Sequence, residues 1–329
     1  MGRSMMRNIL LVSFLVALVV LAACDGNKNK GRSAKDVQDV FLGGTQGLAI
    51  SFEENRPPKS IITGTSGEVF TVGVQLLNKG EVEVPADKVK VRLAGLNPVT
   101  VGVANPVISP DGDIQAREKV SDEVIEPALV YARYNGLKYT TEVSSSTDII
   151  ADVCYPYETK VRSRLCVLED PRGPGAEDKV CNFAEAVPTA NSGAPLQVTD
   201  VKEMPRVDKI RFLFTIAKVD GSDTSSVYKQ GTNCFPDALA DKQKLRDVQD
   251  WVLVEVNAAD KLRGLSCAGF QEKVSDTSGY VLLGSDGKSS SLYCEFSVAD
   301  ATTDFAEFID LALKYQYKES VKMTVTLES

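Results

Sequence analysis

Apolar and polar residues alternate along most of the chain, which is the period-two pattern of strands with one buried face. Within residues 68–85, Phe70, Val72 and Val74 alternate with smaller or polar neighbours. The alternation breaks at residues 78–80 (Asn-Lys-Gly) and then resumes. This segment predicts a strand, a tight turn and a second strand.

Further strand-like runs are separated by Gly, Pro, Asn and Asp, the residues that favour turns. Residues 129–143 place Asn135-Gly136 between two aromatic-rich runs, which predicts a hairpin. Two separate strands are predicted at 147–157 and 160–169, and a short helix at Asp237–Asp247. Other strand-like runs lie at 89–96, 207–222, 248–256, 279–298 and 308–329. Short strands joined by turns predict an all-β fold of antiparallel β-sandwiches.

The segment 187–198 is small, polar and contains proline, which is typical of a boundary between domains. We therefore expect two tandem β-sandwich domains, 39–192 and 193–329, with the helix as an insertion in the second. The length of 329 residues suits about two domains.

A weak internal repeat accompanies this division. Residues 154–169 align without a gap with residues 314–329, so that Tyr155 matches Tyr315 and Tyr157 matches Tyr317. Each domain would then finish in one hairpin of the same design. Chance is the competing explanation of the match.

The first 23 residues have the anatomy of a secretory signal peptide: Arg3 and Arg7, then an apolar run from Ile9 to Ala23. The run is shorter than the roughly 20 residues that cross a membrane as a helix. Residues 24–38 are mostly polar and lack the apolar surface needed to fold alone, so they predict a flexible tether.

The end of the apolar run, Leu21-Ala22-Ala23-Cys24, resembles the lipobox of prokaryotic lipoproteins. The resemblance implies that Cys24 is diacylated through its sulfur and becomes the first residue after cleavage. Two acyl chains anchor a protein stably where one does not. The expected location is the extracytoplasmic face of the cell membrane. An ordinary signal peptide, or an uncleaved anchor, is the alternative.

The net charge of −8 argues against binding to nucleic acid. Histidine is absent from the whole chain, which excludes His-based catalytic triads and His-ligated metals. We find no catalytic constellation in the sequence and expect neither an enzyme nor a cofactor.

Six cysteines remain besides Cys24, and an even set in an exported protein predicts disulfides. Six cysteines allow 15 pairings, among which sequence alone does not choose. Cys166 and Cys181 flank a Pro- and Gly-containing loop, and Cys267 and Cys294 lie in or beside strand-like runs. Pairing each of these couples leaves Cys154 with Cys234. A thiolate metal site is the rival, although no Cys-x-x-Cys spacing occurs, and we expect no metal.

The other candidate sites are better explained as turns or as residues that pack in the core. Asp111-Gly112-Asp113, residues 220–223 and residues 285–287 are acidic segments that suit turns better than calcium loops. The four tyrosines of the repeat are candidate binding platforms, but we expect one ring of each pair to pack inward and one to be half-covered. Trp251 is expected to pack in the core or on a sheet face.

Residues 70–96, "FTVGVQLLNKGEVEVPADKVKVRLAGL", resemble the adhesion-related immunoglobulin-like modules of CARDB type in prokaryotic surface proteins. In that family a strand ends in an Asn-x-Gly turn before the next strand. The resemblance implies immunoglobulin-like sandwiches in an adhesive or spacer role. The second domain departs from it, with "AKVDGS" at 217–222 in place of the turn. The whole layout resembles archaeal lipoproteins with two such domains.

These observations predict a surface lipoprotein that acts as an interaction, adhesion or envelope-structural module, bound to the membrane through Cys24 and to a protein or envelope partner. The alternative is a ligand-binding lipoprotein, such as a solute receptor or an accessory subunit of a transporter or exporter. It would need a cleft between the domains, involving the helical insertion.

Overall fold

The computed structural model describes residues 37, 39–103, 105–121, 123–169, 181, 187–206, 208–236, 239–258, 262–289, 291–298 and 303–329. The predicted signal peptide, Cys24 and nearly all of the predicted tether lie outside the described residues. Val37–Ser329 form one compact unit. The expected division of this unit at 192/193 stays a prediction.

The described elements are almost all strands, which confirms the all-β fold class. The helical elements are η1 (Ala86–Lys88), α3 (Pro98–Val101) and α4 (Leu239–Asp247). The last of these confirms the predicted helix. The strands are β1 (Leu48–Phe52), β2 (Ser60–Ile62), β3 (Phe70–Asn78), β4 (Lys90–Ala94), β5 (Val107–Ile108), β6 (Glu118–Val120), β7 (Glu123–Ile125), β8 (Val130–Leu137), β9 (Ser145–Val167), β10 (Thr189–Asn191), β11 (Leu196–Pro205), β12 (Lys209–Lys218), β13 (Ser225–Tyr228), β14 (Trp251–Ala258), β15 (Arg263–Ala268), β16 (Glu272–Lys273), β17 (Ser278–Leu282), β18 (Leu292–Ser297) and β19 (Phe305–Glu328).

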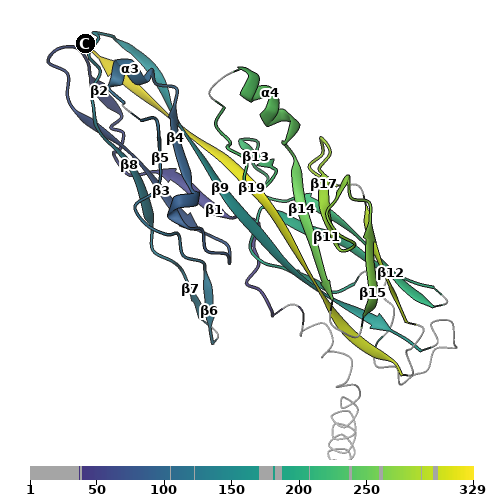
Figure 1. Ribbon diagram of the computed structural model, residues 1–329. Helices are drawn as coiled ribbons and strands as arrows, with labels where there is room; N and C mark the ends of the chain where they lie inside the picture. Colours follow the sequence, from purple (N-terminus) through teal and green to yellow (C-terminus); the bar gives the residue numbers. More distant parts are fainter. Residues whose placement is uncertain are drawn as a thin grey trace, which may run out of the picture. The chain divides into compact units, whose positions relative to one another are not determined.

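Two long strands, β9 and β19, form the centre of the largest sheet (Figure 1). They pair antiparallel from Ser145↔Leu327 to Val167↔Phe305. The sheet runs in the order β16-β17-β14-β19-β9-β4-β5, with β2, β10 and β13 attached beside this path. All of its pairs are antiparallel except β2 with β19.

Two smaller sheets pack near opposite ends of this long pair. The sheet β1-β3-β8 comes from the first half of the chain, and β11-β12-β18-β15 from the second. Tyr134 on β8 donates a hydrogen bond to the Val91 carbonyl on β4, and Thr159 on β9 donates one to the Leu196 carbonyl on β11. One continuous hydrophobic cluster includes residues from the largest sheet and from both of these smaller ones, and β6 and β7 form a separate two-stranded sheet.

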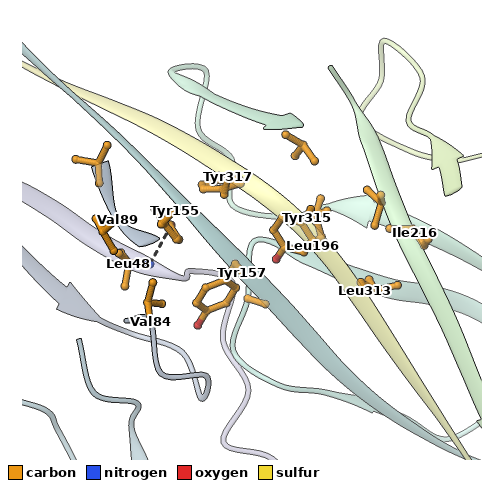
Figure 2. Close-up of a cluster of buried hydrophobic side chains, with 14 of the residues drawn as sticks. Leu48, Val84, Val89, Tyr155, Tyr157, Leu196, Ile216, Leu313, Tyr315 and Tyr317 are labelled. Atoms are coloured by element: carbon orange, nitrogen blue, oxygen red, sulfur yellow. Dashed lines mark hydrogen bonds between the residues drawn. The ribbon is translucent and has the colours of Figure 1, made fainter. Parts of the chain in front are cut away.

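The four tyrosines of the repeat lie in the middle of this core (Figure 2). Tyr155 lies opposite Tyr317, and Tyr157 opposite Tyr315, with ring centroids 5.7 and 6.4 Å apart. Each hydroxyl has a polar partner, as buried tyrosines usually do. The Leu48 amide donates to Tyr155, for example, while Tyr157 donates to the Gly193 carbonyl.

The predicted hairpin at Asn135-Gly136 is wrong, because β8 continues through both residues. The register pairs Phe70 with Leu137 and Val72 with Tyr134, so two residues of β8 lie opposite Thr71. This is a β-bulge, and Gly136 supplies the positive φ of 73° that such a bulge favours. The Asn-Gly pair provides the same backbone conformation to a bulge as to a turn.

Three other predictions about strands and hairpins also need correction. Residues 147–157 and 160–169 form one strand, β9, instead of two. The repeat does not close two hairpins, because its two copies belong to β9 and β19 and pair with each other. After the turn at Asn78, whose side chain bonds to Gly80 and Val82, the expected second strand is reduced to a single bridge between Val84 and Ile114.

Candidate functional site

The six cysteines form the pairs Cys154–Cys234, Cys166–Cys181 and Cys267–Cys294, which is the pairing that the sequence favours. Each sulfur is therefore bonded to another sulfur and is not a thiolate ligand. Cys267 and Cys294 face each other across β15 and β18, as expected. Cys154–Cys234 joins the middle of β9 to the segment between β13 and α4.

The four tyrosines are not binding platforms, because all are buried, with at most 3% of any side chain exposed. The expectation that one ring of each pair is half-covered is also wrong. Residues two apart on a strand share a face, so both rings of each Tyr-x-Tyr enter the same core.

The acidic turns have structural partners. Asp111 and Asp113 accept hydrogen bonds from the backbone amides of Tyr131 and Ala86. Trp251 is half-buried, with Lys229 Nζ 5.4 Å from its ring centroid. Throughout the described ranges, no group of three or more Cys, Asp or Glu side chains is placed to hold a metal ion.

Asp220 belongs to a buried polar network on the tyrosine face of the long strands. Tyr317 and Ser225 donate hydrogen bonds to its Oδ2, and Lys218 Nζ lies 3.7 Å from its Oδ1. Burial, with the nearby Asp220 carboxylate as a second cause, raises the pKa of Glu319 to about 7. Burial likewise raises the pKa of Tyr317 above its usual value. The network is stabilised by hydrogen bonds within the fold.

The opposite face of the long strands carries the surface that we assign as the candidate site. Because successive side chains alternate, Cys154 and Pro156 on β9 and Gln316 and Lys318 on β19 point away from the tyrosines. The loop 229–236, which we call the anchored loop, covers this face and is held there by the Cys154–Cys234 disulfide.

A small buried cluster fixes the anchored loop. Cys154, Tyr228, Cys234 and Phe235 are each at most 4% exposed, and Leu245 of α4 packs against them. Within the loop, the Phe235 amide donates to Asn233 Oδ1, and the Asn233 amide group donates to the Phe235 carbonyl.

From the other side, the guanidinium of Arg92 on β4 lies 4.6 Å from the centroid of the Phe235 ring, a cation–π contact. The anchored loop is thus in contact with elements from both halves of the chain.

One groove beside the anchored loop, which we call the central groove, has a volume of about 770 Å³. This is within the range typical of small-ligand sites. Its lining includes the buried residues Phe235 and Gln316 and the exposed residues Lys88 and Lys90, so apolar and polar groups converge there. It is lined by Asp87, Lys88, Lys90, Val107, Cys154, Pro156, Gln230, Gly231, Thr232, Asn233, Phe235 and Gln316.

A second groove lies between the anchored loop, α4 and the long strands, and has a volume of about 460 Å³. Arg92, Lys242, Arg246 and Lys318 line it, so we call it the basic groove. Sequence reasoning identified the helix and the disulfide candidates separately. It missed the grooves, because nothing local in the sequence shows that α4 and the anchored loop lie on β4, β9 and β19.

Within the described ranges, no helix is both long and apolar enough to cross a membrane. The chain matches no protein-family model and no curated protein.

Proposed function

We propose that this protein is a lipid-anchored, extracytoplasmic interaction module made of two immunoglobulin-like β-sandwiches that share β9 and β19. The lipobox-like sequence at Leu21–Cys24 supports the anchor and the location. Three disulfides support an oxidising compartment outside the cytoplasm. The module is non-catalytic and has a protein or envelope component as its partner.

The observation that carries the proposal is the Cys154–Cys234 disulfide, which fixes a loop over the junction of the two halves. Residues of this loop line both the central groove and the basic groove. A fixed loop loses little conformational entropy when a partner binds, which favours recognition. The edge strands β5 and β16, which stand at the two ends of the strand order of the largest sheet, offer further contacts through strand addition.

The test is a comparison of strains of the source organism. One strain keeps residues 1–38 and lacks residues 39–329, and a second expresses the full chain from the same promoter. We expect impaired attachment or weakened envelope integrity in the deletion strain and recovery in the second. Normal attachment and an intact envelope in the deletion strain would count against the proposal.

A second candidate function is ligand binding, as in a solute receptor or a transporter accessory subunit. The size and mixed lining of the central groove favour it. A thermal-shift screen of small molecules should then give a rise of several degrees that Thr232→Trp, which fills the groove, removes. A screen in which no compound raises the unfolding temperature would contradict this second candidate function.

A further inference from the structure

We infer that the basic groove is a binding site for phosphate groups. This inference deepens the proposed function, on which it rests for its biological setting. The geometry points to an anion because cationic side chains from three separate parts of the chain converge on one concave surface: Arg92 from β4, Lys242 and Arg246 from α4, and Lys318 from β19.

The four cationic side chains differ in whether a carboxylate already forms an ion pair with them. Arg92 is already paired, with its Nη2 2.6 Å from Oδ2 of Asp152. Asp152 is buried and also accepts a hydrogen bond from Ser320, so its charge is balanced locally. Within the described part of the chain, no carboxylate lies within ion-pair distance of Lys242, Arg246 or Lys318.

The remaining three positive charges line one groove of a protein whose net charge is −8. Lys242 and Arg246 are also four residues apart on one helix, a spacing at which like charges repel and weaken the helix. A phosphate group between the helix and Lys318 would relieve this repulsion. Arginine and lysine are the side chains that bind phosphate best.

The rest of the lining fits a phosphate carried on a larger molecule. Leu245 and Pro236 offer apolar contacts, and Gln249 offers an amide donor. The volume of about 460 Å³ leaves room beyond a phosphate for part of the molecule that bears it. The Cys154–Cys234 disulfide holds one wall in place, because Cys234 itself lines the groove.

The test uses the full lipidated chain in nonionic detergent, with inorganic tripolyphosphate as the probe in a calorimetric titration. We expect saturable binding that weakens as salt is raised, since exposed charges are screened. Lys242→Gln/Arg246→Gln should reduce the affinity by roughly tenfold for each charge removed. The matched control, Lys59→Gln/Lys209→Gln, removes two exposed charges that do not line the groove and should change the affinity less than about twofold.

The single substitution Lys318→Gln is on β19 and leaves α4 unchanged. A loss of binding in this variant is therefore not explained by unfolding of the helix. Lys318→Gln should weaken binding roughly tenfold. No saturable binding by the wild-type protein would overturn the inference. Equal losses in the groove variants and the control would also overturn it, because binding would then depend only on net charge.

The source of the phosphate is settled by adding an anionic phospholipid to the detergent. Displacement of tripolyphosphate assigns the groove to lipid headgroups, and undisturbed binding assigns it to soluble or polymer-borne phosphate; both results support the site. If the wild-type protein does not bind tripolyphosphate but the deletion strain has a clear envelope defect, only the phosphate site is contradicted. If tripolyphosphate binds but the deletion strain shows no defect in attachment or in the envelope, only the proposed function is contradicted.

Discussion

Pro156 of β9 lies directly opposite Gln316 of β19, and these two residues occupy equivalent places in the two copies of the repeat. The first tyrosine of each copy therefore faces the second tyrosine of the other. An antiparallel pair with this register has a local two-fold axis through the Pro156–Gln316 pair. The tyrosine cluster lies on one side of the sheet at this centre, and the candidate site on the other.

Loss of the Cys154–Cys234 disulfide should destabilise the protein and open both grooves. In the chain-entropy account, a cross-link between residues 80 apart stabilises more than one between residues 15 apart. We expect Cys154→Ser/Cys234→Ser to lower the free energy of unfolding by about 4 kcal/mol, and Cys166→Ser/Cys181→Ser by about 3 kcal/mol. Urea unfolding of the two variants checks the order, and a larger loss for the second would contradict it.

Replacing Gly80 should disrupt the contact between the first sheet and the long strands. A Cβ atom there would collide with the Tyr157 hydroxyl and with the carbonyl of Gly193, a backbone atom that cannot turn aside. We expect Gly80→Ala to cost about 2–3 kcal/mol in thermal unfolding. Gly112→Ala is the control, because nothing lies within 4 Å of its Cβ position, and it should be nearly neutral.

Two substitutions of Tyr155 distinguish the stability contributed by the packing of its ring from that contributed by the hydrogen bond to its hydroxyl. Tyr155 is fully buried, and its hydroxyl accepts a hydrogen bond from the Leu48 amide. We expect Tyr155→Phe to cost about 1–2 kcal/mol from the amide left without this acceptor, and Tyr155→Ala about 3–5 kcal/mol from the added cavity. Equal costs in chemical denaturation would mean that the ring contributes nothing beyond its hydroxyl.

Stability should decline as the pH rises from about 4.5 to 7. The folded protein holds a proton on Glu319, whose pKa is raised to about 7, whereas the unfolded chain releases that proton near the usual value of 4.5. The unfolded state therefore binds fewer protons in this window, and the free energy of unfolding falls as the pH rises. Because Glu319 is partly exposed, we expect a loss of about 1–2 kcal/mol.

Glu319→Gln is the matched variant for this pH dependence, because it is neutral throughout the window. It should flatten the decline, as measured by urea unfolding at several pH values. Glu203, with a pKa raised to about 8 by burial, acts in the same direction and will leave a residual slope. A slope that is identical in the variant would show that Glu319 does not hold its proton in the folded state.

The all-β class and the helix at 239–247 followed from hydrophobic alternation and turn residues, which are local signals. The lengths of β9 and β19 do not follow from such signals, because the sequence predicts separate strands at 147–157 and 160–169 and a closing hairpin for each copy of the repeat. In the structure these strands continue, since each provides the other's backbone partners over its whole length. Local propensity is overridden here by long-range pairing.

Local sequence patterns also do not predict most of the candidate site. The pairing of Cys154 with Cys234 follows from placing the other cysteines, and it joins residues 80 apart along the chain. The convergence of Arg92, Lys242 and Lys318 depends on how β4, α4 and β19 meet in space. Their separation along the chain left no local pattern from which to predict a groove.

The proposed function requires that the chain be exported and lipid-anchored and that a disulfide hold the anchored loop. The direct measurement is the intact mass of the protein from a membrane fraction, alkylated without prior reduction. We predict the mass of residues 24–329 plus the acyl groups on Cys24, with no alkylated thiol. A mass without lipid, or with alkylated cysteines, would contradict the account.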